Sequence, residues 1–302
     1  MDQFNAMKAF CRVFEVGSFS AAAAEINVAH TVMSKQVRQL ETELGVQLFN
    51  RTTRKLAATE AGQTYYEHAR RILDAMEDAS LMLSRHQSQP GGSLRINAPM
   101  AFGTLELAWW LPEFMALYPD IKVDLVCNDR YVDLIDEGFD VALRLARELP
   151  DSSLMAKRLG SSAIVVAASP AYLQQHGAPK TPADLAQHNC LAYTLADKPH
   201  EWTFVQADGK RLSVAVRGNF QANTGIALRA AALAGVGIVM SADFILHEDL
   251  RSGKLLPLLD GYALQPRELY AVYPQNRHLS PKVRAFIDFA AARYQDTLRA
   301  GP

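Results

Sequence analysis

The stretch N27-V-A-H-T-V-M-S-K-Q-V-R-Q-L-E41 decides how the amino-terminal part of the chain folds. Successive residues of an α-helix advance by about 100° around its axis. Four apolar side chains in and just beyond the stretch therefore share one narrow arc, which predicts a face turned toward a core: Met33, Val37, Leu40 and Leu44. The opposite side carries side chains that can donate to phosphates and base edges: Thr31, Ser34, Lys35 and Arg38. Alone, this pattern fits an ordinary surface helix as well as one that enters DNA.

The start of this helix lacks a capping side chain at the expected place. The side chain of Ala29 cannot accept a hydrogen bond from a backbone amide, and alanine instead of serine at an N-cap costs about 1 kcal/mol. We expect Asn27 or Thr31 to cap the helix instead, which would shift its first residue. The role of His30 is open between a contact with a base or phosphate and a structural role at the helix start.

The residues before this stretch predict two further helices. An apolar stripe marks the first helix: Met7, Phe10, Cys11, Val13 and Phe14. We expect Gly17 to end it and Ser20 to cap the second helix, which reaches Ile26. The alanines at 21–24 are small enough to let two helices cross closely, and a tight turn at Asn27 follows. A helix, a tight turn and a second amphipathic helix form the helix-turn-helix plan.

A basic segment follows the third helix. Residues 44–59 contain no acid, and the chain turns at Gly45 into an extended stretch, R51-T-T-R-K-L-A57. Such a stretch is typical of a wing that lies along the phosphate backbone or in a minor groove, although alone it also fits a solvated loop. The candidate DNA contacts in this segment are Arg51, Thr52, Thr53, Arg54 and Lys55.

A long helix comes next, which we expect Thr59 to cap and which should run from Glu60 to about Gln87. Its apolar residues follow spacings of four and three, as in a heptad repeat: Ala61, Tyr65, Ala69, Ile72, Met76, Ala79 and Leu83. This stripe could pair with a second protomer or pack on the chain's own carboxy-terminal part. The segment S88-Q-P-G-G-S93 then stops the helix and marks a domain seam.

Beyond the seam, strand and helix patterns alternate, which favours a mainly parallel, doubly wound sheet. The predicted strands cover residues 93–99, 121–126, 141–145, 163–168, 236–241 and 269–273, with a hairpin at 202–216. The predicted helices cover residues 104–117, 133–138, 223–234 and 280–293. Ser280 and Pro281 are suited to the N-cap and first position of the last helix.

Composition and missing motifs exclude several classes of protein. The chain has 302 residues, of which 49% are hydrophobic and 21% charged, and the net charge is −1. Three widely spaced cysteines favour a reducing cytosol over a disulfide scaffold. There is no signal-peptide pattern and no apolar run long enough for a membrane span. Nucleophile-elbow, phosphate-loop and zinc-protease motifs are absent, so we expect no enzyme, no metal and no cofactor.

Residues 4–66 resemble the winged helix-turn-helix of the LysR-type transcriptional regulators. The resemblance rests on F10-x-x-V13-x-E15-x-G17-S-F-S20-x-A22-A-x-x-I26, followed by S34-K-Q-V-R-Q-L-E41-x-x-L44-G-V-x-L-F49-x-R51-x-x-R54-x-L56-x-x-T59-x-A61-G62. N50-R-T-T-R54, E137-G-F-D-V-A-L-R144 and A271-V-Y-P resemble a subgroup with that wing. Family members usually have Ser-Gln or Ser-Pro-Ser where this chain has Ala29-His30-Thr31, so its preferred bases are expected to differ. With Ser20 and His30 included, the resemblance implies DNA contacts from the second and third helices and from the wing.

The resemblance also implies an α+β multidomain architecture. We expect a DNA-binding domain at 1–59, a linker and dimerisation helix at 60–88, and an effector-binding domain of the type-2 periplasmic-binding-protein fold at 89–302. Lobe I would comprise 93–162 and 267–302, and lobe II 163–266, with chain crossings near Ser161–Ser162 and Pro266–Arg267. The linker helix would pair with that of another protomer through Tyr65, Ala69, Ile72, Met76 and Leu83, and dimers would pair into tetramers.

The effector is expected in a cleft between the lobes, beyond the carboxyl ends of strands and near helix N-termini. The candidate contacts are Pro99, Met100, Ala101, Phe102, Arg144, Tyr193, Asn223 and Thr224, with Tyr131 a weaker one. They could hold a small anionic or aromatic compound. Asn223 could instead serve only as an N-cap, and Arg144 could form a structural ion pair.

The expected protein is therefore a cytoplasmic transcription regulator under effector control. Its expected partners are double-stranded DNA with a dyad-symmetric promoter site, the effector, itself as homodimer and homotetramer, and RNA polymerase, with no membrane partner. A solute-binding protein without a DNA role is the alternative, but it would need a secretion signal and would have no use for the DNA reader.

Overall fold

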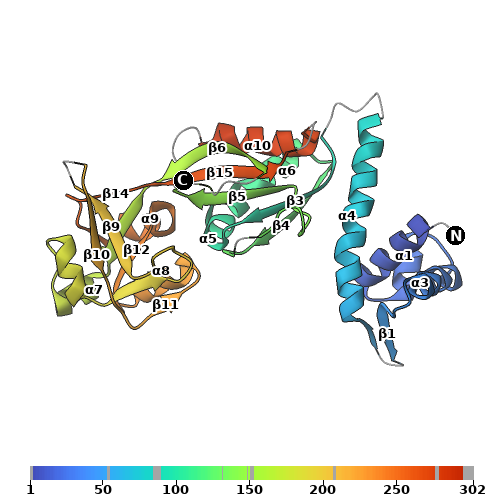
Figure 1. Ribbon diagram of the computed structural model, residues 1–302, viewed down its shortest axis with the longest axis horizontal. Coiled ribbons are helices and arrows are strands. Elements are labelled where there is room, and N and C mark those ends of the chain that lie inside the picture. The colour runs from blue at the N-terminus through green and yellow to red at the C-terminus, as the bar shows by residue number, and fades with distance from the viewer. Residues whose placement is uncertain are drawn as a thin grey trace. The chain divides into compact units, whose positions relative to one another are not determined.

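The computed structural model describes residues 3–52, 55–83, 90–130, 132–147, 149, 153–206, 209–275 and 279–294 (Figure 1). The chain divides into two compact units, Met1–Ser88 and Gln89–Pro302. The division falls at the Pro-Gly-Gly segment, where the sequence changes from helical patterns to alternating strands and helices.

The first unit combines short helices, a hairpin and a long helix. The helices α1 (Gln3–Val16), α2 (Phe19–Glu25) and α3 (His30–Leu44) precede an antiparallel hairpin of β1 (Phe49–Thr52) and β2 (Lys55–Ala58), and α4 (Glu60–Leu83) follows. Left-handed backbone at Gly17, Asn27 and Gly45 makes the turns, with φ of 69°, 55° and 70°. The predicted helix-turn-helix with its wing is confirmed.

The core of this unit forms where α3 meets α1. Met33, Val37 and Leu40 are each 0% exposed, as predicted for the inner face of α3. They belong to the same cluster as Phe10 of α1, whose ring centroid lies 5.2 Å from that of Phe49. The prediction for Leu44 is wrong: its side chain is 36% exposed, because α3 ends there and the chain turns away at Gly45.

Two predicted caps are also wrong. Ser18 caps α2, because its extended backbone lets Oγ accept from the amide of Ala21, whereas Ser20 lies inside the helix and is exposed. Ala29 is the N-cap residue of α3 and provides no side-chain hydrogen bond, so the helix start is not shifted. Asn27 cannot cap α3 because it makes the left-handed turn before it.

The start of α4 is fixed to the hairpin. Thr59 caps the helix as predicted, since its Oγ1 accepts from the amide of Gly62 at 2.9 Å. Gly62 itself lies against the backbone of Leu48, and a Cβ at this position would be 2.1 Å from the Leu48 carbonyl oxygen. The wing and the long helix are therefore in direct backbone contact. The predicted end of the helix near Gln87 lies outside the described residues.

The apolar stripe of α4 has two different parts. Tyr65 and Ala69 pack in the core of the first unit, where the Tyr65 ring lies 5.3 Å from that of Phe10 and Ala69 is 1% exposed. The expectation of one uncovered stripe is therefore wrong for this part, because α1 covers it. Ile72 and Met76 are each 48% exposed, and the side chain of Leu83 is not described.

The second unit contains two five-stranded sheets with the same plan. The lobe I sheet has the order β4 (Ile121–Cys127), β3 (Gly92–Ala98), β5 (Val141–Ala146), β15 (Arg267–Pro274), β6 (Leu154–Ser162). The lobe II sheet has the order β11 (Gln221–Ala222), β8 (Cys190–Tyr193), β12 (Ile238–Ala242), β7 (Ile164–Ala168), β13 (Leu256–Leu258). A smaller sheet, β10 (Arg211–Ala215), β9 (Glu201–Val205) and β14 (Ala263–Leu264), contains the predicted hairpin.

These sheets are mixed rather than mainly parallel. The first three strands of each are parallel, but β15 runs antiparallel to both of its neighbours in lobe I, and β7 does so in lobe II. The reason is that the chain passes directly from β6 to β7 and from β14 to β15, so one strand in each sheet arrives from the other lobe. Strand alternation alone does not reveal such crossings.

Helices cover the sheets. An uninterrupted helical segment runs through α5 (Met100–Phe102), a π-helical turn η1 (Gly103–Leu107) and α6 (Ala108–Leu117), so it begins earlier than predicted. The others are α7 (Pro170–His176), a 3₁₀ helix η2 (Pro182–Gln187), α8 (Gly225–Leu233), α9 (Asp243–Arg251) and α10 (Pro281–Tyr294). The helix predicted at 133–138 is a turn, in which the carboxylate of Asp133 accepts from the amides of Ile135 and Asp136.

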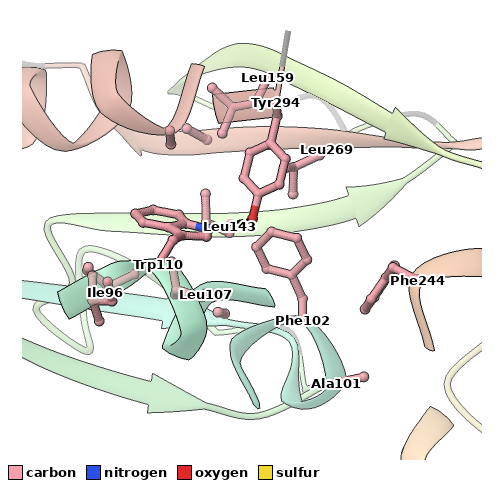
Figure 2. Packing of buried hydrophobic residues seen from close by; sticks show 14 of the residues in the cluster. Ile96, Ala101, Phe102, Leu107, Trp110, Leu143, Leu159, Phe244, Leu269 and Tyr294 are labelled. Carbon is pink, nitrogen blue, oxygen red and sulfur yellow. Dashed lines mark hydrogen bonds between the residues drawn. The ribbon is translucent and has the colours of Figure 1, made fainter. Parts of the chain in front are cut away.

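Aromatic side chains form the centre of the lobe I core (Figure 2). Trp110 of α6 packs against Phe286 of α10 and donates from Nε1 to the hydroxyl of Tyr294 at 2.6 Å. Phe102 is 0% exposed and meets Phe244 of α9 edge-on, with ring centroids 5.8 Å apart. Because Phe244 belongs to lobe II, this pair joins the apolar surfaces of the two lobes.

Candidate nucleic-acid interface and effector site

The outer face of α3 presents cations that are not committed to other residues. Thr31, Lys35 and Arg38 are exposed and Ser34 is half-buried. Among the described residues, neither the Lys35 ammonium nor the Arg38 guanidinium has a hydrogen-bond or ion-pair partner. The opposite face of the same helix is locked in the core, so these side chains stand on a fixed base and can donate to a polyanion.

Glu41, at the far end of α3, has a structural role that the sequence pattern does not reveal. Its carboxylate accepts from the backbone amides of Leu48 and Phe49, at 2.9 and 3.1 Å. These bonds fasten the first strand of the wing to α3. An acid near a DNA-binding face therefore positions the wing, and its hydrogen-bonding oxygen is turned toward the protein.

His30 is the first residue of α3, and Ser20 is an exposed residue of α2. The His30 ring is exposed and meets the edge of Phe19, with centroids 6.1 Å apart and planes at 71°. Phe19 in turn packs edge-on against Phe49. The imidazole is thus held on an aromatic support at the exposed end of the helix, an arrangement compatible with both of its predicted roles.

The wing is described in part. Its register pairs Arg51 with Leu56 and Thr52 with Lys55. Thr53 and Arg54 lie outside the described residues, and the side chains of Arg51, Thr52 and Lys55 are not described. The backbone nevertheless pairs Arg51, Thr52 and Lys55 in a hairpin whose base is fastened to α3 and α4.

In the second unit, the start of α5 is occupied by a carboxylate of the same chain. The amide of Met100 donates to Asp129 Oδ1 at 2.8 Å. Burial raises the pKa of Asp129, and the Met100 hydrogen bond opposes this shift. Pro99 is half-buried and Met100 is exposed, but Ala101 and Phe102 are buried in the core. Only the first two of these four candidates offer accessible surface.

Arg144 is held by an amide. Its Nη1 donates to Asn97 Oδ1 and to the carbonyl of Leu143. Asn97 is 0% exposed and its Nδ2 donates to the carbonyl of Val126. Asn97 therefore links three neighbouring strands and sets the direction in which Arg144 leaves β5.

Tyr193, at the end of β8 in lobe II, lies near charged residues of lobe I. Burial raises the pKa of its hydroxyl, the negative charge of Asp129 raises it further, and Arg267 lowers it. Burial lowers the pKa of Arg267, and the like charge of Arg147 adds to that effect. Two guanidinium groups and a phenol are thus gathered near the carboxyl ends of β4, β5 and β8.

Two buried atoms in this region lack a partner among the described residues. They are Asn128 Oδ1 and Arg147 Nε, which follow β4 and β5 directly. A buried polar atom without a hydrogen bond is costly, and such atoms often mark the place of a ligand or water. Sequence reasoning missed four members of this group, although the position of three just after a strand was a usable signal: Asn128, Asp129, Arg147 and Arg267.

The remaining candidates lie at the start of α8. Thr224 is its N-cap residue, with Oγ1 accepting from the amide of Ile226 at 3.4 Å, so the prediction that Asn223 caps this helix is wrong. Asn223 is exposed and Thr224 is half-buried. Tyr131 lies outside the described residues. No group of His, Cys, Asp and Glu in the described ranges could hold a metal ion.

Comparison with known sequences places both units in one family. Residues 4–63 match the family described as bacterial regulatory helix-turn-helix protein, lysR family, and residues 87–295 match the LysR substrate binding domain. The chain belongs to the LysR family. It is a LysR-type transcriptional regulator with a helix-turn-helix DNA-binding domain and a substrate-binding effector domain, and a solute-binding protein without a DNA role is not favoured.

Relatives of this LysR-type regulator match nearly its whole length. It is 39% identical over 282 residues to the HTH-type transcriptional regulator CrgA of Neisseria meningitidis serogroup B, which covers 93% of each chain. It is 35% identical over 288 residues to the HTH-type transcriptional activator AaeR of Escherichia coli K12, which covers 95% of this chain and 93% of AaeR. No enzyme family is matched by either domain.

Solved structures agree with the fold. The structure of CrgA from Neisseria meningitidis matches with a TM-score of 0.63 at 36% identity, over 97% of this chain and 99% of CrgA. The full-length structure of the Vibrio cholerae virulence activator AphB matches with a TM-score of 0.62 at 29% identity, over 96% of this chain and 99% of AphB. Among the described helices of this LysR-type regulator, none has the length and apolar character needed to cross a bilayer.

Proposed function

We propose that the regulator reads a dyad-symmetric promoter site through the outer face of α3 and contacts phosphates through the wing. The observation that carries this proposal is the pair of uncommitted cations, Lys35 and Arg38, on a helix whose inner face is fully buried. The proposed DNA-binding surface of α2 and α3 also includes Ser20, His30, Thr31 and Ser34. Five wing residues, Arg51, Thr52, Thr53, Arg54 and Lys55, complete it on the hairpin, as in the resembled subgroup.

Fluorescence anisotropy with promoter DNA across a salt series tests the division of roles. Arg51→Ala should weaken binding to all sequences and reduce the salt dependence by about one unit of slope. Ser34→Ala and Arg38→Ala should instead change the preference among operator variants. Lys8→Ala is a matched control, because Lys8 is an exposed cation on α1, which packs on the inner face of α3. An equal loss on every sequence for Arg38→Ala would refute base reading by α3.

We further infer that α4 pairs with the same helix of a second protomer, and that dimers assemble into tetramers. Ile72 and Met76 support this, since each is a large apolar side chain that is 48% exposed, whereas Tyr65 and Ala69 of the same helix pack in the core. Leu83 extends the proposed contact, whereas Tyr65 and Ala69 support α4 from within the protomer. Ile72→Asp should shift the sedimentation profile toward smaller species, and Gln63→Asp on the same helix should not.

The proposed effector is a small anion bound between the lobes. Three arginines supply the positive charge: Arg144, Arg147 and Arg267. Among the described residues, Nε of Arg147 has no hydrogen-bond acceptor. Hydroxyl groups come from Tyr193 and Thr224. The accessible rim of the proposed site is completed by Pro99, Met100 and Asn223. Phe102 is buried and would be affected by effector binding only through its contact with Phe244. An aromatic carboxylate would satisfy both the charges and the phenol.

A thermal-shift screen of carboxylates on the full chain tests the effector site. A ligand of the folded state raises the unfolding midpoint with its concentration. Arg147→Gln should abolish the shift, whereas Arg211→Gln, an exposed arginine on β10, should leave it intact. A shift retained in Arg147→Gln contradicts this placement.

Effector binding would act by changing lobe closure, and through it the angle between dimers and the bend in the DNA. This requires the effector to bind the two states with different affinity. The footprint and bend angle should therefore differ with and without a verified ligand. Identical values in both conditions contradict the mechanism. Contact with RNA polymerase at the promoter and a cytoplasmic location accompany this proposed role.

A further inference from the structure

Lobe II carries a pocket at the end of its sheet opposite to the proposed effector cleft. The pocket has a volume of about 450 Å³ and is lined by Ala186, Gln187, His188, Asn189, Arg217, Gly218 and Asn219. Asn189 immediately precedes β8, whereas Tyr193 ends it. At about 3.3 Å per residue, the two ends of that strand are separated by roughly 13 Å. The pocket and the cleft are therefore different places on lobe II.

The walls of this pocket are rigid. Asn189 Nδ2 donates to Asn219 Oδ1 at 2.8 Å, and the backbone amide of Asn219 donates to Asn189 Oδ1 at 2.9 Å. Asn189 Nδ2 also donates to the carbonyl of Val236. At Gly218 a Cβ would lie 2.0 Å from the Cys190 carbonyl oxygen, so this segment lies flat against β8. The amide of Cys190 donates to the carbonyl of Arg217, which fixes the root of that side chain.

A hydrogen-bond chain holds His188 in place. The amide of Asn189 donates to the buried hydroxyl of Tyr172 at 2.9 Å, and that hydroxyl is hydrogen-bonded to His188 Nδ1 at 3.2 Å. Burial lowers the pKa of His188, which favours the neutral ring. The ring of His188, which lines the pocket, is therefore fixed through Nδ1.

Arg217 supplies an uncommitted cation to the pocket. Its guanidinium is exposed and has no hydrogen-bond or ion-pair partner among the described residues. His188 adds its ring and Gln187 an amide group. Asp184, whose negative charge acts on His188, accepts hydrogen bonds from the amides of Lys180 and Thr181. A planar carboxylate is the ligand group that a guanidinium fork and a neighbouring N–H recognise best.

We propose that this pocket is a second ligand site that binds a small carboxylate through Arg217 and His188. Its volume corresponds to the lower range of metabolite sites. The site is independent of the effector cleft, because none of its residues belongs to the Arg144, Arg147 and Arg267 group. A regulator with both sites could respond to two metabolites.

Saturation-transfer difference NMR on the full chain, with malonate as the probe, tests the site. Malonate should bind saturably, and Arg217→Gln should weaken its affinity by about tenfold, the effect of losing one charge-assisted contact. His188→Gln should weaken it less. Arg211→Gln is the matched control and should leave the affinity unchanged, and Arg147→Gln separates binding in the cleft from binding in the pocket.

Three results overturn the proposal. They are the absence of saturable binding, an equal loss in Arg217→Gln and Arg211→Gln, and a loss in Arg147→Gln with none in Arg217→Gln. The last result would place malonate in the cleft and support the proposed effector site instead. Inorganic phosphate is titrated in parallel, and tighter binding of phosphate than of malonate would contradict the assignment to carboxylates.

Discussion

The two units of the molecule place their candidate functional groups in opposite ways. In the first unit, Lys35 and Arg38 lie on the exposed face of α3, and the opposite face of the same helix packs in the core. In the second, Asn97, Asp129 and Arg144 lie among buried strand ends and are hydrogen-bonded within the chain. Substitutions at the proposed DNA contacts should therefore leave the fold intact, whereas substitutions at the proposed effector site should also change stability.

The largest expected effect is on the inner face of α3. Met33→Ala removes a side chain that is 0% exposed and should destabilise the first unit by about 2–5 kcal/mol. Leu44→Ala on the same helix, where the leucine is 36% exposed, should cost under about 1 kcal/mol. Hydrogen exchange of the α3 amides in the full chain measures both. Equal losses of protection would mean that the helix has no distinct inner face.

The next effect concerns the strand ends of lobe I. Asn97→Ala should destabilise the second unit by about 1–3 kcal/mol, because it removes a buried amide that serves Arg144 and Val126. All three tryptophans lie in this unit, so tryptophan fluorescence during urea unfolding reports on it. Asn223→Ala, at an exposed position of the proposed rim, is the control. Unchanged stability in Asn97→Ala would break the proposed link between effector recognition and folding.

A pH-dependent effect sharpens the same contrast. Burial raises the pKa of Glu106 from 4.5 to about 7, and Arg293 opposes the shift. A carboxyl with a raised folded pKa stabilises the fold fully below the unfolded value and loses that contribution as pH rises through about 7. Between about pH 5 and pH 8 the wild type should lose on the order of 2 kcal/mol more than Glu106→Gln. Parallel pH profiles of the two proteins in urea unfolding would contradict burial as the cause.

The smallest expected change in stability is on the exposed face of α3 that we propose to contact DNA. Lys35→Ala and Arg38→Ala should each alter the free energy of unfolding by no more than about 0.5 kcal/mol, since neither side chain has a partner among the described residues. DNA affinity should nevertheless fall. Thermal unfolding and DNA binding measured on the same preparations separate the two quantities, and a marked loss of stability would show that this face also supports the fold.

The sequence predicts the first unit well because its elements are local. The helical period identifies Met33, Val37 and Leu40, and turn residues mark the element ends. The helical period wrongly predicts that Leu44 is buried, because α3 ends at this residue and the chain turns away at Gly45. Tyr65 and Ala69 were assigned to a partner's helix because the pattern cannot show that α1 already covers them.

In the second unit, the sequence predicts the strands and several candidate positions but not the cluster that they form. Asp129 and Arg267 of lobe I act on Tyr193 of lobe II only because the chain crosses between the lobes twice, and no local spacing encodes such a meeting. Asn223 and Thr224 are both good capping residues, and the choice depends on which one adopts extended backbone. Tertiary geometry decides these cases.

Because Gly62 packs directly against the backbone of Leu48, α4 sets a fixed distance between the wing and the residues farther along the helix. With the wing fastened to its first turn, the helix fixes how far Ile72 and Met76 lie from the DNA-binding surface. Its 24 residues span about 36 Å, and each inserted residue would rotate everything beyond it by about 100°. The spacing between the two half-sites of the operator would then depend on the length of α4. Insertions or deletions of whole helical repeats could change this spacing, whereas those of single residues could not, because they would also rotate the helix.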